Sequence, residues 1–176
     1  MKKKFKSGKG ILFWITGLSG SGKTTIGKKI YKFITNKFGP TILVSGDDLR
    51  DIFKLKKYDH SSRMQYLNYY LNFNKKITNQ GINVIMCVVG LSEQIRIKNK
   101  KIFKNYVEIY IKSSVNLIKS NKKKKIYNNK KNVWGVDLKP QFPKSPDILI
   151  KNNFSRSAKE LSDELIIKLK KNYLDE

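Results

Sequence analysis

The stretch ILFWITGLSGSGKT at residues 11–24 constrains the fold of this chain more than any other. Its opening run, ILFWIT, is almost entirely apolar, which is typical of a strand buried on both faces of a sheet. The next eight residues, Gly17 to Thr24, match G-x-x-x-x-G-K-[ST] and lead into a helical pattern that extends to about Phe38. A buried strand, a glycine-rich turn and a helix in this order predict a phosphate-binding loop.

Short apolar runs and longer helical patterns alternate along the rest of the chain. We expect further strands at 41–45, 82–89, 106–111 and 147–150, and helices from Asp47, at about 61–80, at about 92–104, from about Ser113 and from Ser155. This order predicts an α/β class: a three-layer P-loop nucleoside-triphosphate hydrolase-like fold, with helices on both faces of a five-stranded, mainly parallel sheet. The 176 residues suit one domain, 1–176, in which we expect 1–10 to be flexible.

The formal charge of +25 allows two interpretations. Lysines can bind a polyanion, but here they are spread through the chain among many Asn and Ile residues, a bias that AT-rich coding produces. We favour this bias, combined with attraction of small anionic substrates, and therefore do not expect a nucleic-acid partner. The densest lysine cluster lies within 119–135, which we expect to form a mobile lid.

The sequence also bears on the cellular compartment. No apolar run reaches about 18 residues, and the start MKKKFKSGKG lacks the apolar stretch of a signal peptide. We expect a cytoplasmic protein with no membrane partner. The single cysteine, Cys87, lies in the apolar run INVIMCVV and is predicted to be a buried thiol.

The glycine-rich motif predicts how ATP and Mg²⁺ are held. The glycines let backbone N–H groups face the phosphates, Lys23 can reach the β- and γ-phosphates, and the hydroxyl of Thr24 suits Mg²⁺. The candidate nucleotide-binding residues are Gly17, Ser19, Gly20, Ser21, Gly22, Lys23, Thr24 and Thr25. The motif alone does not distinguish hydrolases, motors and kinases.

A second group of polar residues follows the strand expected at 41–45. Asp47, Asp48 and Arg50 come directly after it, at the edge where open parallel sheets bind ligands. We expect Asp47 to accept the proton of an attacking hydroxyl and to help hold Mg²⁺, which would make it catalytic together with Lys23. The simpler alternative is that Asp47 only caps the following helix.

The chain resembles the adenylyl-sulfate kinases over about Ile11 to Ile150. Three segments carry the resemblance: FWITGLSGSGKTTI looks like the family's phosphate loop, SGDDLRDIF like its Asp-Gly-Asp-x-x-Arg segment, and KIYNNKKNVWGVDLKPQFPKSPDI like its lid. The third segment is the specific one. The resemblance implies transfer of the γ-phosphate of ATP to the ribose 3′-hydroxyl of a nucleotide-linked acid.

The resemblance also assigns roles to individual residues. It places the general base at Asp47 and substrate-binding arginines at Arg50 and Arg63. It places Lys124 and Tyr127 in the lid, and base-stacking groups at Tyr58 and either Val133 or Trp134. Aromatic faces bind bases without sequence-specific contacts, which agrees with a stacking role, although ordinary packing is the alternative for Trp134.

The chain departs from the family mainly in the half of the site that receives the phosphate. After its Asp-Arg the family usually has Glu-Asn-Ile-Arg-Arg, where this chain has residues 65–69, QYLNY. Loss of two arginines removes cations from an anion site. We therefore keep two acceptors open, adenylyl sulfate and cytidine diphosphoramidate. Tyr66 and Tyr69 are expected to pack their helix against the sheet rather than line this site.

Other classes of function stay open at this stage. The alternative to a small-molecule kinase is a nucleic-acid-binding P-loop protein or a polynucleotide kinase that uses the basic surface. A scaffold that binds nucleotide without turnover is a third interpretation. The oligomeric state is not determined by the sequence, and a homodimer is one candidate.

Overall fold

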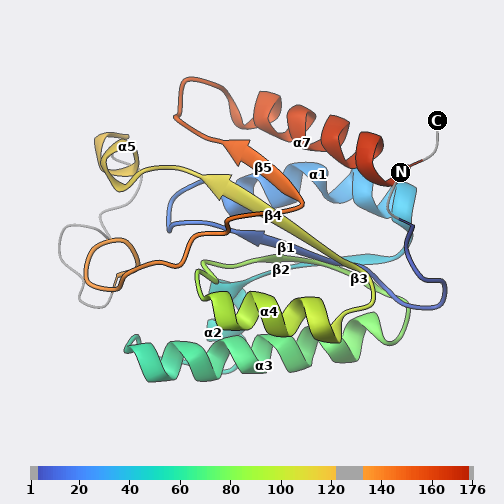
Figure 1. Cartoon of the computed structure of the whole chain (residues 1–176), viewed down its shortest axis with the longest axis horizontal. Coiled ribbons are helices and arrows are strands. Elements are labelled where there is room, and N and C mark those ends of the chain that lie inside the picture. The colour runs from blue at the N-terminus through green and yellow to red at the C-terminus, as the bar shows by residue number, and fades with distance from the viewer. Residues whose placement is uncertain (1–3, 122–132, 175–176) are drawn as a thin grey trace.

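A computed structural model describes residues 4–121 and 133–174 of the chain. Within these ranges five parallel strands form one sheet in the order β2-β3-β1-β4-β5 (Figure 1). The strands are β1 (Leu12–Thr16), β2 (Thr41–Ser45), β3 (Asn83–Cys87), β4 (Tyr106–Lys112) and β5 (Ile148–Lys151). The helices are α1 (Lys23–Phe38), α2 (Gly46–Ile52), α3 (His60–Thr78), α4 (Glu93–Ile102), α5 (Val115–Ser120) and α7 (Ala158–Tyr173). The predicted α/β class and its parallel sheet are confirmed.

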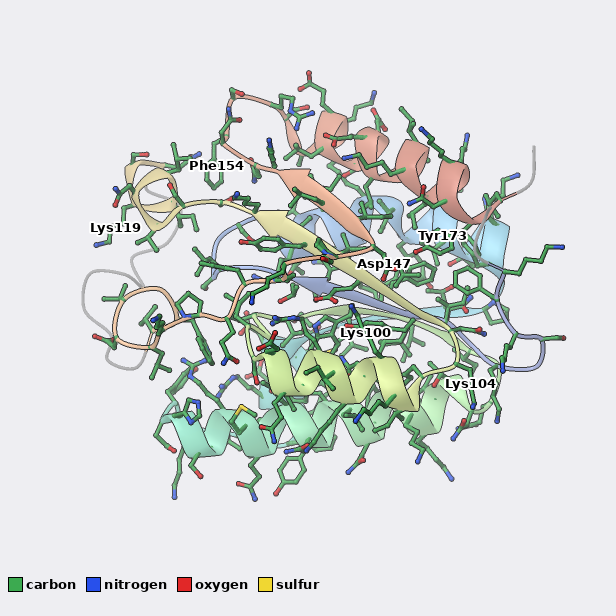
Figure 2. All side chains as sticks on the ribbon, viewed as in Figure 1. Lys100, Lys104, Lys119, Asp147, Phe154 and Tyr173 are labelled. Carbon is green, nitrogen blue, oxygen red and sulfur yellow. The ribbon has the colours of Figure 1, made fainter. Side chains whose placement is uncertain are left out.

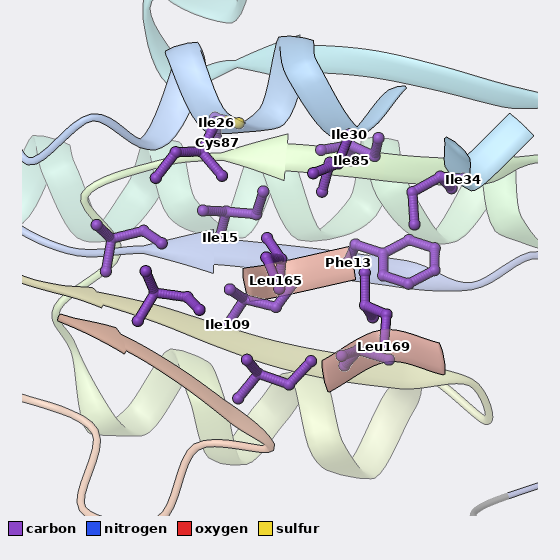
Figure 3. Packing of buried hydrophobic residues seen from close by; sticks show 14 of the residues in the cluster. Phe13, Ile15, Ile26, Ile30, Ile34, Ile85, Cys87, Ile109, Leu165 and Leu169 are labelled. Atoms are coloured by element: carbon purple, nitrogen blue, oxygen red, sulfur yellow. The ribbon is translucent and has the colours of Figure 1, made fainter. Parts of the chain in front are cut away.

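Side chains of the central strand β1 point alternately to the two faces of the sheet and contribute to a hydrophobic core on each face. Phe13 and Ile15 point to one face of the sheet, where they pack with α1 and α7. Leu12 and Trp14 point to the other face, where they pack with residues of α3 and α4. Figure 1 shows these helix pairs on opposite sides of the sheet, and Figure 3 shows the first core. Every β1 side chain is buried, which explains the continuous apolar run.

Helix boundaries differ from the predicted ones by a few residues, because capping side chains define them. Asp59 caps α3 by accepting a hydrogen bond from the Ser62 N–H at 2.9 Å, so the helix begins at His60. Ser157 and Glu160 form a capping box on α7, which begins three residues after the predicted Ser155. No helix in the described ranges is long and apolar enough to cross a membrane.

Residues 4–10, part of the start that we expect to be flexible, make defined contacts in the structure. The side chain of Asn105 accepts a hydrogen bond from the Lys6 N–H at 2.7 Å and donates to the carbonyl oxygens of Lys6 and Lys9. The Phe5 ring stacks on Tyr173 of α7, with ring centroids 5.0 Å apart. These contacts hold the segment against the sheet and the last helix.

Candidate active site

The phosphate-binding loop joins β1 to α1 and has a backbone conformation that requires glycine at two positions. Gly20 and Gly22 have positive φ angles of 82° and 96°, in the left-handed region that glycine adopts without strain. Gly22 is the N-cap of α1, and the first turn of the helix carries no acidic residue, so its N-terminus presents positive potential. The Lys23 ammonium donates to the Leu18 carbonyl at 2.7 Å within the loop.

A pocket of about 720 Å³ lies where β1, β2 and β3 end. Its walls combine the phosphate-binding loop, the start of α2, the first turns of α3, the residues after β3, and segments near 133 and 154. The predicted site residues that line it are Ser19, Gly20, Gly22, Lys23, Thr24, Thr25, Asp47, Arg50, Tyr58, Arg63, Val133 and Trp134. Gly17 and Ser21 are in the described chain but do not line the pocket, and Lys124 and Tyr127 lie outside the described residues.

Asp47 lines the pocket at the second residue of α2, and the helix cap is a different residue. Ser45 is the N-cap, and its hydroxyl accepts a hydrogen bond from the Asp48 N–H at 3.1 Å. The Asp48 carboxylate completes this capping box by accepting from the Ser45 N–H at 2.7 Å. The alternative in which Asp47 is the cap is therefore wrong, and the exposed Asp47 carboxylate is left on the pocket wall.

Arg50 is held by the loop that joins α2 to α3. One of its guanidinium nitrogens donates to the carbonyl oxygens of Leu55 and Lys57, at 3.2 and 3.1 Å. The guanidinium carbon lies 4.3 Å from the centre of the Tyr58 ring, a cation–π distance. These hydrogen bonds go to neutral carbonyl groups, so the positive charge of Arg50 remains available to an anion.

Arg63 brings a second guanidinium to the same wall. Its Nε donates to the Tyr58 carbonyl at 2.7 Å, and its guanidinium carbon lies 5.4 Å from the Tyr58 ring centre. Burial, followed by repulsion from Arg50, lowers the pKa of Arg63 from its ordinary value. Arg50 and Arg63 thus bring two guanidinium groups to one wall of the pocket, an arrangement that can bind an acidic group.

Two tyrosines of α3 also line the pocket, and one of them, Tyr66, was expected from the sequence only to pack. Tyr66 and Tyr70 lie one helical turn apart, and Tyr66 is three residues after Arg63, so all three residues share one face of the helix. The Tyr70 hydroxyl donates to the Gly46 carbonyl at 3.3 Å, and burial raises the pKa of Tyr70 to about 12. The helical spacing from Arg63 was a signal for this placement. Tyr69 is exposed and does not line the pocket.

Trp134 both packs in a core and borders the pocket. It is 6% exposed and clusters with Leu18, Leu91, Ile118 and Val133. The packing interpretation is therefore supported, and Trp134 also lines the pocket. Its ring centroid lies 6.2 Å from that of His60 at the start of α3.

Asn152 is a site residue that the sequence analysis missed. Its side-chain amide donates to the Ser21 carbonyl at 2.9 Å, and its side-chain oxygen accepts from the Phe154 N–H at 3.0 Å. Its own carbonyl accepts from the Ser113 hydroxyl at 2.7 Å. Asn152 thus joins the phosphate-binding loop to the ends of β4 and β5. Phe154, labelled in Figure 2, follows with a positive φ of 68° and lines the pocket.

Comparison with known proteins decides the family. The family model described as adenylylsulphate kinase matches residues 9–151. The chain belongs to the adenylylsulphate kinase family. The predicted class of enzyme, an ATP-dependent phosphotransferase, is thereby confirmed.

Two curated relatives differ in the acceptor that their names give. The chain is 37% identical to a cytidine diphosphoramidate kinase of Campylobacter jejuni subsp. jejuni, over 89% of this chain and 94% of the relative. It is 29% identical to an adenylyl-sulfate kinase of Clostridium kluyveri, over 87% of this chain and 80% of the relative. The names of these two relatives of this adenylylsulphate kinase family member therefore give both of the acceptors considered from the sequence.

A solved structure of the adenylylsulphate kinase family has the same fold. The Mycobacterium tuberculosis APS kinase in complex with AMPPNP and APS superposes with a TM-score of 0.81. The match covers 92% of this chain and 98% of that one at 22% identity. This likeness supports the P-loop kinase fold.

Proposed function

We propose that this chain transfers the γ-phosphate of ATP to the ribose 3′-hydroxyl of a nucleotide-linked acid, with cytidine diphosphoramidate as its acceptor. One observation carries the proposal: Lys23, Asp47 and Arg50 line a single pocket of about 720 Å³. Such a pocket suits a nucleotide pair whose phosphates meet between a phosphate loop and a carboxylate. The choice of the 3′-hydroxyl follows the family resemblance.

The donor half of the site would hold ATP by its phosphates. Backbone N–H groups of the loop and the N-terminus of α1 would surround the β- and γ-phosphates, and the Lys23 ammonium would leave the Leu18 carbonyl for them. Asn152 fixes the loop through Ser21, so the N–H groups are positioned before ATP binds.

The acceptor half would orient the hydroxyl and take its proton. Arg50 and Arg63 would bind the acidic group of the acceptor, and Tyr58 and Trp134 would contact its base. Asp47 would accept the proton as the ribose oxygen forms a bond to the γ-phosphorus. The bond from that phosphorus to the bridging oxygen breaks at the same time, and ADP leaves with the electron pair.

The residues also fit a magnesium ion bound with ATP. The Thr24 hydroxyl and the Asp47 carboxylate line the same pocket, and both are oxygen donors of the kind that Mg²⁺ accepts. No group of three or more His, Cys, Asp or Glu suited to a metal occurs among residues 4–121 and 133–174, so ATP phosphates would complete the coordination. When bound, the ion would neutralise phosphate charge.

Two observations favour cytidine diphosphoramidate over adenylyl sulfate. The relative named for it is more similar, at 37% against 29% identity. The segment 65–69 departs from the adenylyl-sulfate kinase pattern, and Tyr66 brings one of these departures to the pocket wall. The finer expectations of a cytoplasmic location and a homodimer are part of the proposal and do not affect the chemistry.

Initial rates of ADP release with different acceptors test the proposal. We expect turnover with cytidine diphosphoramidate and slower turnover with adenylyl sulfate. CMP and AMP serve as comparison substrates that lack the acidic extension, and a random oligonucleotide serves as a polymeric comparison substrate. Preferred turnover of adenylyl sulfate would reverse the acceptor assignment. Phosphorylation of the oligonucleotide alone would favour a polynucleotide kinase.

A further inference from the structure

Tyr66 is one of the departures from the family pattern that line the pocket, and the one that contacts Arg50. Its side chain is 7% exposed and lines the pocket beside Arg50 and Arg63. Asn68 and Tyr69, at the positions where the family has two arginines, do not line the pocket. The Asn68 side chain instead donates to the Met64 carbonyl and accepts from the Lys98 ammonium of α4, at 2.9 and 3.3 Å. Tyr66 is therefore on the pocket wall, whereas the two positions of the missing arginines are not.

The ring of Tyr66 supports Arg50. The guanidinium carbon of Arg50 lies 5.1 Å from the Tyr66 ring centre and 4.3 Å from the Tyr58 ring centre. Two aromatic rings within cation–π range restrict where a planar guanidinium can point. Tyr58 is 43% exposed, whereas Tyr66 is anchored in the core shared by α3 and the sheet. Tyr66 is thus the more rigid of the two supports.

The hydroxyl of Tyr66 connects the same support to the α2–α3 loop. It accepts a hydrogen bond from the Lys57 N–H at 3.3 Å. The carbonyl of Lys57 in turn accepts from the Arg50 guanidinium at 3.1 Å. One loop residue is therefore bonded on one side to Tyr66 and on the other to Arg50. The three residues form a closed unit in which ring, loop and guanidinium fix one another.

We infer that Tyr66 is a positioning residue that sets acceptor selectivity by holding Arg50 against the acidic group of the acceptor, an inference that rests on the proposed function. A guanidinium fixed in one orientation favours an acidic group at one distance from the ribose. An acceptor whose acidic group lies elsewhere gains less from it. Tyr66 acts through Arg50 and through the α2–α3 loop. It does not act through the phosphate-binding loop.

Steady-state kinetics on three variants test this inference. Tyr66→Leu removes the ring and the hydroxyl, Tyr66→Phe removes only the hydroxyl, and Tyr69→Phe is the matched control on the exposed face of α3. We expect Tyr66→Leu to raise the KM for cytidine diphosphoramidate about tenfold and Tyr66→Phe about threefold, from the loss of a cation–π support and of one hydrogen bond. The KM for ATP should change less than about twofold in both, because the donor half is untouched.

The outcomes separate this inference from the proposed function. Equal rises in both KM values, or an unchanged acceptor KM in Tyr66→Phe, would overturn the inference while wild-type turnover upheld the proposed function. If wild-type enzyme phosphorylated neither nucleotide-linked acid, the proposed function would fail and the inference with it. Circular dichroism and melting temperature report whether Tyr66→Leu is folded. If it is not, Tyr66→Phe decides, because it keeps the buried ring.

Discussion

Ser45 and Asp48 exchange two hydrogen bonds across the first turn of α2, at 2.7 and 3.1 Å, and Asp47 between them takes no part in this capping box. The neighbouring carboxylates of Asp47 and Asp48 therefore differ in role, because only Asp48 caps the helix. Both residues line the pocket, but the Asp48 carboxylate is bonded to a backbone N–H at the helix start, whereas the Asp47 carboxylate is outside the capping box. The same short segment thus provides a structural carboxylate and a candidate general base.

Replacing the two carboxylates should therefore have different effects. Asp47→Asn should lower kcat about 10²–10⁴-fold by removing the proposed general base. Its melting temperature should stay close to that of wild type. Asp48→Ala should instead lower the free energy of unfolding by about 1 kcal/mol through loss of the capping box. Rapid-quench kinetics and urea unfolding measure the two effects, and comparable kcat values for Asp47→Asn and wild type would remove Asp47 from the mechanism.

Asn152 should affect both stability and ATP binding. Asn152→Ala leaves the buried Ser21 carbonyl without its side-chain donor and should lower the free energy of unfolding by about 1–3 kcal/mol. The KM for ATP should rise because the phosphate loop is less well positioned. Asn153→Ala is the control, since this neighbouring side chain is exposed and bonds only to Ser155 among the described residues. Equal KM values for the two variants would contradict the assignment.

Cys87 should react with thiol reagents only when the chain unfolds. Burial raises the pKa of Cys87 to about 12, so the folded protein holds a neutral thiol across the whole working range of pH. Because the folded pKa is raised, the stability linked to this thiol is present below its unfolded pKa and is lost as the pH rises toward 12. A disulfide reagent at pH 8 should label the chain in urea much faster than in buffer. Rapid labelling in buffer would show that the site opens.

A buried ion pair offers a separate test of the fold. Glu108 of β4 pairs with Arg96 of α4 at 3.0 Å, and their side chains are 2% and 7% exposed. Glu108→Gln leaves the Arg96 charge buried without its partner and should cost about 3–5 kcal/mol of unfolding free energy. Asp163→Asn is the control, because it breaks an exposed pair with Lys159 and should cost less than about 1 kcal/mol. Similar denaturation midpoints would contradict the packing of α4 on the sheet.

The sequence predicted those structural features that depend on residues close together in the chain. The apolar run before Gly17 and the helical pattern after Lys23 predicted β1, the loop and α1, and the position of Asp47 after a strand predicted its place at the sheet edge. Contacts between distant segments were not predictable. Asn152 bonds to Ser21 across 131 positions, and no local pattern marks such a pair.

The acceptor half of the pocket was also only partly predictable from the sequence. Arg50, Tyr58 and Arg63 were identified by motif or by resemblance, and the pocket brings all three together. Tyr66 was assigned to packing because its helical spacing fits a core residue, and it is indeed buried. Spacing shows which face of a helix a side chain occupies, but it does not show where the core ends and the pocket begins. The structure was needed to show that Tyr66 belongs to both.

The position of the transferred phosphate tests the central claim most directly. Wild-type enzyme incubated with ATP, Mg²⁺ and cytidine diphosphoramidate can be followed by phosphorus NMR, with proton coupling to locate the new ester. We predict one new phosphomonoester coupled to the ribose 3′-proton, formed in equal amount with ADP. Inorganic phosphate as the only product besides ADP, or a phosphate attached elsewhere, would contradict the account.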